Sequence, residues 1–451
     1  MVVKSASPVA SQILAEIGLS DLPGDWGIVR IESLLCDDRG ISVGVMYPGD
    51  HDPEGVPLVK SGDIARDHIN PKPEFRITKD KHYEYRRTAF MGGELLISLV
   101  GDVGRCALVP HQMAGWNAAR AIAVLRLRNT TDAEFVRACL MSEPLQYLMQ
   151  AWSTTTVQAT LNLKEIRQIP LPWPPKKQRL AISRTLGVLD DKIELNRRMN
   201  ETLEAMARAL FKDWFVDFGP TRAKQEGLEP YLAPHLWSLF PERLDREGKP
   251  EGWKCGTLTD VADLNSESWS AKCSPDHVEY VDLANTKWGT IEATERYLWS
   301  DAPSRARRVL RLGDTIVGTV RPGNGSYAFI GQDGLTGSTG FAVLRPKQPL
   351  YREVVYFAAT APENIERLSH RADGAAYPAV RPDVVGNTEF IKGVISVIQA
   401  FSYACAPLVD RMEANKQESR TLAQTRDLLL PKLMSGEIRV KDAEKTMEAH
   451  L

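Results

Sequence analysis

Residues 178–215 read QRLAISRTLGVLDDKIELNRRMNETLEAMARALFKDWF, and this stretch decides the fold. It has no interior proline, and its inward positions step by four and three residues in turn, which is the heptad pattern of a helix that packs on another helix. The predicted seam consists of Ile182, Leu186, Leu189, Ile193, Asn196, Asn200, Leu203, Ala207, Leu210 and Trp214. A helix of about 33 residues extends roughly 50 Å, so a stripe this narrow requires a partner helix.

The chain itself supplies the partner, because the seam occurs twice. Adding 219 to each position gives Phe401, Cys405, Leu408, Met412, Asn415, Ser419, Leu422, Arg426, Leu429 and Leu433. Asn196 and Asn415 occupy equivalent positions, where a polar residue fixes the register of a coiled coil. They are surface positions if the seam is rotated by one residue. In the alternative arrangement, each helix packs separately on its own domain.

Other segments repeat in nearly the same register. Ala123-Val124-Leu125-Arg126 returns at 342–345, and Gly93-Glu94 returns at an offset of 220 as Gly313-Asp314. In both halves a mixed segment of short strands and turns precedes the long helix. We therefore predict an α/β (α+β) fold with a pseudo-twofold internal repeat, in which two similar domains are separated by two long antiparallel helices that form a coiled coil.

The repeat also predicts the domain boundaries. Residues 1–175 form the first domain, 176–218 the central helix, 219–394 a linker with the second domain, 395–435 the C-terminal helix and 436–451 a tail. The segment 219–250 has no counterpart in the repeat.

The composition narrows the class of protein. The 451 residues are 43% hydrophobic and 25% charged, which is typical of a globular protein. No signal peptide or membrane-length apolar run is present, so a cytoplasmic location is expected. The six cysteines are scattered and predict neither a disulfide framework nor a metal site. Because the net charge is -2, any nucleic-acid surface must be local, and residues 72–87 and 296–321 are the two basic stretches.

Two similar modules on paired antiparallel helices suit a ligand with local twofold symmetry, and duplex DNA has that symmetry. Because the modules differ in sequence, the two half-sites that they read would also differ. The expected ligand is therefore double-stranded DNA with a split, asymmetric target and an unread spacer.

Several motifs strengthen this interpretation. The first half contains TTVQATLNLK (155–164), IPLPWPP (169–175) and WFVDF (214–218). The second half contains GSTGFAVLR (337–345), GAAYPAVR (374–381) and LPKLMSGEI (430–438). Taken together and in this order, they resemble the specificity subunits of type I restriction-modification enzymes over nearly the whole chain.

The resemblance implies two target-recognition domains and two helical conserved regions. The helices would set the spacer and bind two methyltransferase (modification) subunits, which hold S-adenosylmethionine and methylate one adenine in each half-site. Two restriction subunits, which translocate and cleave DNA using ATP, are further implied partners. This chain itself would hold no cofactor.

Candidate base-reading residues lie in or near exposed loops. Arg and Lys can bond guanine with two donors, whereas Asn can bond adenine, and glycine-rich loops allow close approach. The loops after the Gly93 and Gly313 strands, 101–105 and 321–327, are equivalent. The predicted DNA-binding residues are Lys60, Arg105, Asn117, Arg120, Asn285, Lys287, Arg321, Asn324, Tyr327, Tyr377 and Arg381. The alternative for each is a solvated turn, or, for Tyr377, packing at the base of its domain.

No catalytic residues are predicted. The chain lacks an amino-methylation motif of the Asn-Pro-Pro-Tyr type, a Walker phosphate loop and a zinc-binding histidine pair. We therefore expect a non-catalytic subunit. The competing hypotheses are a self-contained DNA methyltransferase or nuclease, and a coiled-coil scaffold that binds proteins.

Overall fold

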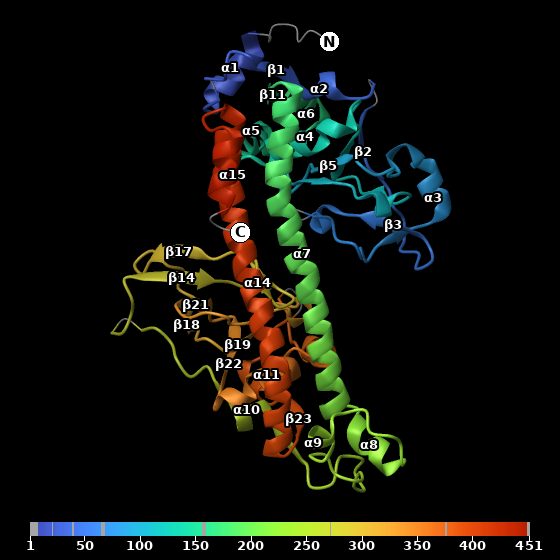
Figure 1. The fold of residues 1–451 in the computed structure, drawn as a ribbon, viewed down its shortest axis with the longest axis vertical. Coiled ribbons are helices and arrows are strands. Elements are labelled where there is room, and N and C mark those ends of the chain that lie inside the picture. Colours follow the sequence, from blue (N-terminus) through green and yellow to red (C-terminus); the bar gives the residue numbers. More distant parts are fainter. Residues whose placement is uncertain are drawn as a thin grey trace. The chain divides into compact units, whose positions relative to one another are not determined.

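The computed structural model describes residues 8–19, 21–37, 40–64, 68–155, 159–270, 272–374 and 377–448. The chain divides into two compact units: unit 1 ends at Asn196 and resumes at Gln417, and unit 2 is Arg197–Lys416. Two long helices, α7 (Lys176–Phe215) and α14 (Ile395–Ser435), are drawn in Figure 1. Each of them is divided between the two units. Within the described ranges, no helix is both long and apolar enough to cross a membrane.

The long helices pair in antiparallel fashion inside each unit. In unit 1, Leu189 from the first part of α7 shares a core with Leu422 and Leu429 from the last part of α14. In unit 2, the ring of Phe211 from the last part of α7 lies 5.9 Å from that of Phe401 in the first part of α14. Since the start of one helix meets the end of the other in both units, the predicted antiparallel coiled coil is confirmed.

Most of the predicted seam is buried, with a correction in unit 2. The buried seam residues are Ile182, Leu186, Leu189, Ile193, Asn196, Ala207, Trp214, Phe401, Cys405, Met412, Asn415, Leu422, Arg426, Leu429 and Leu433. The other seam residues, Asn200, Leu203, Leu210, Leu408 and Ser419, are only half-buried. Phe211 and Val409, next to two of them, are buried instead. The reason is that a third helix, α11 (Arg352–Ala359), packs against the long helices here, so that a wider face of each is buried. The ring centres of Phe357 and Phe211 are 6.2 Å apart.

Arg426 interrupts the apolar seam of unit 1, but it is buried and paired. Its Nη1 atom donates to Oδ1 of Asp190 over 2.6 Å, and Arg137 of α4 (Ala133–Met141) donates to the other oxygen of the same carboxylate. A buried charge is tolerated only when it is paired. The two arginines around Asp190 therefore tie α4 to both long helices in this unit.

Each unit contains the same four-stranded antiparallel sheet. In unit 1 the order is β2 (Ile41–Val43), β8 (Ile122–Leu125), β5 (Leu95–Ser98) and β6 (Cys106–Leu108). In unit 2 it is β13 (Ala262–Leu264), β22 (Phe341–Pro346), β19 (Thr315–Gly318) and β20 (Tyr327–Phe329). The register also repeats, because Leu95 faces Leu125 as Thr315 faces Leu344. The internal repeat predicted from the sequence is therefore present in the fold.

A second sheet in each unit contains one parallel pair. In unit 1 it is β4 (Arg76–Ile77), β3 (Val56–Val59) and β7 (Asn117–Ala118), with β3 parallel to β7. In unit 2 it is β17 (Glu295–Leu298), β14 (His277–Val281), β21 (Leu335–Ser338) and β18 (Ala306–Val309), with β14 parallel to β21. The strands β1 (Gly27–Arg30) and β11 (Pro170–Trp173) pair in unit 1 as β12 (Lys254–Thr257) and β23 (Glu389–Lys392) do in unit 2.

The remaining elements are short. In unit 1 they are α1 (Pro8–Glu16), α2 (Ile31–Leu34), α3 (Lys79–Glu84), α5 (Glu143–Trp152), α6 (Leu163–Gln168), α15 (Val440–Glu448) and the hairpin β9 (Thr154–Thr155) and β10 (Ala159–Thr160). In unit 2 they are α8 (Gly219–Gln225), α9 (Pro234–Trp237), α10 (Leu258–Val261), α12 (Pro362–His370), α13 (Pro382–Gly386) and the hairpin β15 (Thr286–Lys287) and β16 (Thr290–Ile291).

The segment 219–250 was expected to have no counterpart, and the structure corrects this. Its α8 and α9 come after α7, and Phe240 and Leu236 join the core of unit 2 with Trp214. In unit 1, α15 comes after α14 and α1 precedes β1, and Ala443 and Leu14 join the corresponding core. The counterpart escapes a linear comparison because its two pieces lie at opposite ends of the sequence.

Candidate nucleic-acid interface

The repeated charged residues, Glu94 and Arg126 in unit 1 and Asp314 and Arg345 in unit 2, form ion pairs that stabilise each unit. Glu94 accepts hydrogen bonds from the backbone N–H groups of Met91 and Gly92 at 2.7 and 2.8 Å, and it pairs with Arg126. The Nη2 atom of Arg126 donates to the carbonyl of Ala89 over 2.7 Å. The carboxylate thus closes the turn before β5, and the arginine connects that turn to β8.

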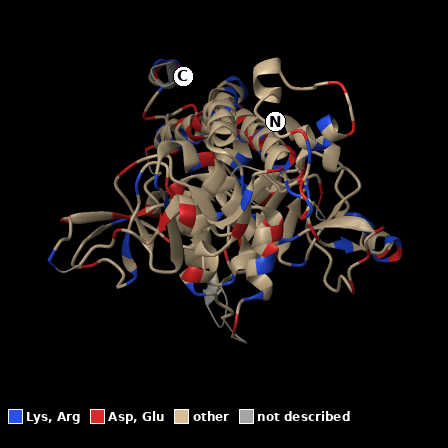
Figure 2. Cartoon of the chain, turned by 90° about the horizontal axis from the view of Figure 1, so that it is seen from below, with Lys and Arg blue, Asp and Glu red and all other residues tan. Residues whose placement is uncertain are grey.

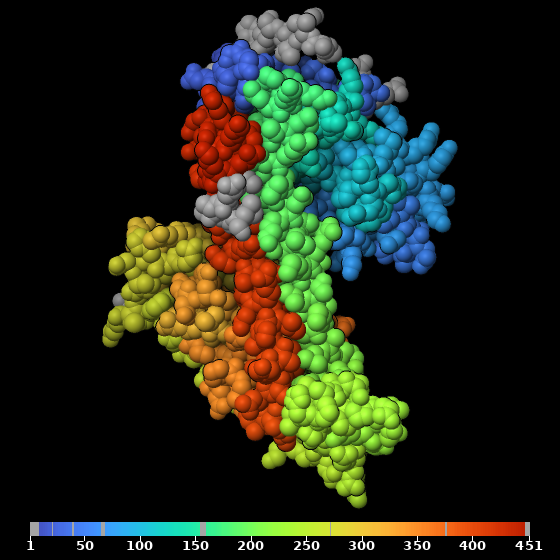
Figure 3. Space-filling view, viewed as in Figure 1, coloured from blue at the N-terminus to red at the C-terminus, as the bar shows by residue number. Residues whose placement is uncertain are grey.

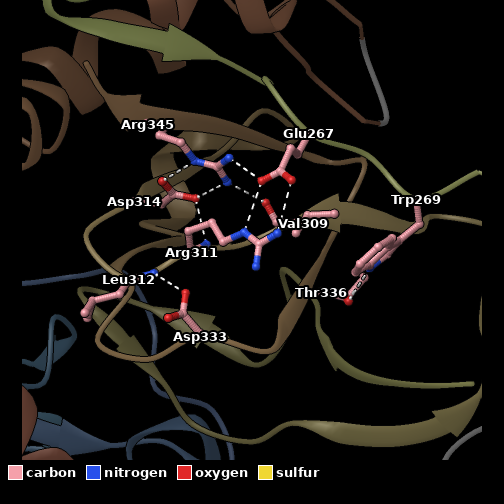
Figure 4. A network of polar contacts seen from close by, with 9 residues as sticks. All are labelled: Glu267, Trp269, Val309, Arg311, Leu312, Asp314, Asp333, Thr336 and Arg345. Atoms are coloured by element: carbon pink, nitrogen blue, oxygen red, sulfur yellow. Dashed lines mark hydrogen bonds and ion pairs between the residues drawn. The ribbon is translucent and has the colours of Figure 1, made fainter. Parts of the chain in front are cut away.

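Unit 2 repeats this clamp (Figure 4). Asp314 accepts from the backbone N–H of Arg311 at 2.8 Å and from Nε and Nη2 of Arg345 at 3.0 and 2.9 Å. Arg345 Nη2 also donates to the carbonyl of Val309 over 3.1 Å. Burial raises the pKa of the Asp314 carboxyl above its ordinary value. These repeated charges therefore serve the fold, and Arg126 and Arg345 are already engaged.

Part of the basic stretch 296–321 is engaged in the same network. Arg311 donates from Nε and Nη2 to the two oxygens of Glu267, both over 3.1 Å, and Arg345 pairs with the same carboxylate. Hydrogen bonds from the two arginines lower the pKa of Glu267 to about 2. Nearby, the Arg307 guanidinium lies 4.4 Å from the centre of the Trp299 ring. Figure 2 shows Lys and Arg interspersed with Asp and Glu along the chain, so we look for the candidate interface in particular loops.

In unit 2 the loop between β19 and β20 carries the clearest set of exposed polar residues. Arg321 has a left-handed backbone, with φ 47, and its guanidinium lies 4.8 Å from the centre of the Tyr377 ring. Its backbone N–H donates to the carbonyl of Pro378 over 2.7 Å, which joins this loop to the segment 377–381. Asn324 and Tyr377 are exposed. A cation, an amide and an aromatic ring therefore share one loop pair.

The hairpin β15–β16 lies beside this loop, and it contains a residue that the sequence reasoning missed. Trp288 lies at its tip with φ 46 and is 60% exposed, and the neighbouring Lys287 is exposed as well. The backbone N–H of Trp288 donates to the carbonyl of Gly325 over 2.7 Å. The sequence Trp-Gly between two short strands was an available signal, because a large aromatic residue seldom occupies a turn of two residues.

In unit 1 the equivalent loop, between β5 and β6, carries Arg105. This side chain pairs with Asp102, donates to the carbonyl of Ile64 over 3.1 Å, and remains 40% exposed. Lys60, at the end of β3, is exposed with its Nζ atom 4.2 Å from the centre of the Phe75 ring. The hairpin β9–β10 lies against this loop through a bridge between Val100 and Thr160, as Val320 and Ala379 do in unit 2.

The remaining predicted residues fall into two groups. Arg120 and Arg381 are exposed, with Arg381 paired to Asp383, and Asn285 is half-buried. Asn117 and Tyr327 are buried. Asn117 accepts from the Thr88 hydroxyl at 2.7 Å, and Tyr327 packs edge to face on Trp288. Neither side chain can reach a base in this structure, because its polar or aromatic face is used inside its own unit. Residues 156–158 and 375–376 of the quoted motifs lie outside the described residues.

Comparisons with known proteins point to DNA specificity subunits. Residues 50–205 match the type I restriction modification DNA specificity domain. The MjaIX specificity subunit of Methanocaldococcus jannaschii is 21% identical, over 95% of this chain and 96% of that protein. The HindI specificity subunit of Haemophilus influenzae is 23% identical, over 85% and 94%. A solved S subunit from M. genitalium covers 92% of this chain and 96% of its own at 15% identity, with a TM-score of 0.49.

The repeated units, the helix pair in each of them and the matched domain define a DNA sequence-specificity protein. The chain is similar over nearly its whole length to specificity subunits of type I restriction enzymes, which are non-catalytic members of their complexes. Its partners are accordingly DNA and the other subunits of such a complex.

Proposed function

We propose that each unit reads one half of a bipartite, asymmetric DNA site. The observation that carries this proposal is that equivalent loops of one repeated sheet present different residues. The loop after β19 offers Arg321 and Asn324 beside Tyr377, whereas the loop after β5 offers Arg105. A shared scaffold with different side chains at the reading positions suits two different half-sites.

The long helices carry the second part of the proposal, which is that they set the unread spacer and bind two methyltransferase subunits. One side of α7 is uncovered (Figure 3), and its exposed residues include Val188, Leu195 and Met206. Exposed apolar residues along a helix suit a partner protein. The helix pairs of the two units repeat each other, which favours two copies of the partner. The partner methyltransferase subunits would hold S-adenosylmethionine. Two ATP-dependent restriction subunits would join the same complex. A cytoplasmic location stays a prediction.

Methylation mapping tests the proposal. The chain is combined with its methyltransferase subunit and S-adenosylmethionine, and the methylated adenines are located by sequencing of a random-sequence DNA library. We expect two short, different sequences at a constant separation, with one N6-methyladenine in each. A continuous or palindromic target would contradict the proposal. The purified chain alone, without the methyltransferase subunit, should leave the same library unmethylated and uncut.

A further inference from the structure

We propose that Trp288 is an apolar base contact of unit 2, and that its indole recognises the 5-methyl group of one thymine in the half-site that this unit reads. The inference rests on the proposed function and adds a named residue and a named base feature to it. Four observations support it: the exposure of the indole, the backbone that presents it, the contacts that hold this backbone, and the side chains that surround it.

The backbone at Trp288 is one that tryptophan rarely adopts. Its φ of 46 lies in the left-handed region, which favours glycine and, among other residues, asparagine and aspartate. The side chain is also 60% exposed, so the turn gains little burial from it. A turn selected for folding alone would carry glycine or asparagine here. An exposed indole on a strained backbone therefore indicates a constraint from function.

Three hydrogen bonds fix this turn. The backbone N–H of Trp288 donates to the carbonyl of Gly325 over 2.7 Å, and the backbone N–H of Gly289 donates to the carbonyl of Tyr327 over 2.9 Å. From α14, Nζ of Lys416 donates to the carbonyl of Gly289 over 2.8 Å. Because the hairpin is tied both to β20 and to a long helix, the indole is presented in one position before any ligand arrives.

The loop below leaves space for the indole. A Cβ atom on Gly325 would lie 2.5 Å from the Trp288 ring system, so only glycine fits under it. The Tyr327 ring meets the indole edge to face, with centres 6.0 Å apart and an angle of 87°. These contacts hold one side of the indole and leave the rest of it exposed.

The surrounding side chains indicate that the ligand is DNA. Lys287 and Asn324 are exposed on the same hairpin and loop, and Arg321 lies on the exposed Tyr377 ring. Cations suit phosphates, and an amide suits a base edge. In the major groove the thymine methyl group is the one apolar feature that the base edges offer. An apolar ring among polar readers therefore fits this group.

Deoxyuridine substitution tests the inference, because uracil lacks only that methyl group. The duplex carries the mapped site, and each thymine of the half-site read by unit 2 is replaced in turn by deoxyuridine. The full chain is compared with Trp288→Gly, which removes the indole and relieves the left-handed backbone, and with Trp288→Phe, which keeps an aromatic ring. Leu312→Ala is the matched control, because this exposed residue of unit 2 lies beyond the other end of β19.

For the unmodified chain and the Leu312→Ala control, we expect one thymine at which deoxyuridine weakens binding by about four- to tenfold, the size expected for one buried methyl group. At that position Trp288→Gly should lose the discrimination, and Trp288→Phe should keep part of it. The inference is overturned if Trp288→Gly retains the same deoxyuridine penalty at every thymine, or if it weakens all duplexes equally. If the unmodified chain does not prefer the mapped site over a scrambled duplex, the proposed function fails and this inference with it.

Discussion

Asn415 donates a hydrogen bond from its side-chain amide to Oδ1 of Asn200 over 2.8 Å. The equivalent contact in the other unit joins the Asn196 amide to the Ser419 hydroxyl over 3.3 Å. Asn196 and Asn415 are 219 positions apart, as are Asn200 and Ser419, so the two pairs exchange partners between the helices. That exchange is expected of a self-complementary antiparallel pair. Each unit therefore has an equivalent polar contact that fixes the register of its two helices.

Removal of one partner tests whether the contact between Asn200 and Asn415 stabilises the helix pair. We expect Asn200→Ala to lower the free energy of unfolding by about 1–3 kcal/mol, because the buried amide of Asn415 loses this acceptor. Denaturant unfolding of the full chain measures the change. Met206→Ala is the control, since this residue of the same helix is exposed and should shift stability by less than about 0.5 kcal/mol. Equal effects of the two substitutions would argue against a role for the polar pair.

The parts of the fold that the sequence predicts depend on local periodicity. The heptad step located both long helices and placed Asn196 and Asn415 at buried positions, because that pattern depends only on residues within one helix. The repeat placed Arg426 on the seam, but its ion-pair partner could not be predicted, because Asp190 is 236 positions away in the chain. Glu94 and Asp314 stood out as repeats, but their clamping role depends on turns whose geometry the sequence does not specify. Trp288 was missed because its importance depends on a backbone angle and on Gly325.

The clamp of unit 2 predicts a strong effect of Asp314. Asp314→Ala removes the acceptor of two guanidinium donors and of one turn N–H. We expect a loss of roughly 1.5–3 kcal/mol, the usual range for hydrogen bonds to charged groups. Hydrogen exchange should locate the loss in β19 and β22 and leave β5 and β8 unchanged. Protection lost equally in both units would contradict independent clamps.

Glu267 predicts a pH dependence of the same unit. Because Arg311 and Arg345 hold its pKa at about 2, below the ordinary 4.5, the folded state binds this proton less readily than the unfolded state. Its contribution to stability is therefore present above pH 4.5 and is lost as the pH falls toward 2. Glu267→Gln should unfold more readily at pH 6 and lose less stability between pH 4.5 and 3. Urea titrations at these pH values measure both slopes, and parallel slopes would contradict the assignment.

Arg321 tests the division of the target between the units. We expect Arg321→Ala to weaken binding through the half-site read by unit 2 by about 1–3 kcal/mol, if the guanidinium bonds a guanine with two donors. The base preferences of the other half-site should be unchanged. Arg105→Ala is the reciprocal variant and should affect only the half-site read by unit 1. Binding selections with randomised half-sites measure both. A uniform loss over all sequences would assign Arg321 to a phosphate.

The helix pair predicts a change in spacer length. Four residues inserted after Asn200 lengthen α7 by about 6 Å and rotate the remainder of the helix about 40° past a full turn. The two polar contacts show where a matching insertion must go: immediately before Asn415 of α14, so that Asn200 still meets Asn415 and Asn196 still meets Ser419.

With four residues in both helices, we expect the half-site sequences to be unchanged and the spacer to lengthen by at most about two base pairs, since the duplex rises about 3.4 Å per pair along its axis. Two residues in each helix provide the control, because about 200° of rotation turns the seam to the opposite side and should abolish pairing. Methylation mapping of the complex reports the spacer directly. If the four-residue variant methylates the original spacer, the helices do not set the distance between the half-sites.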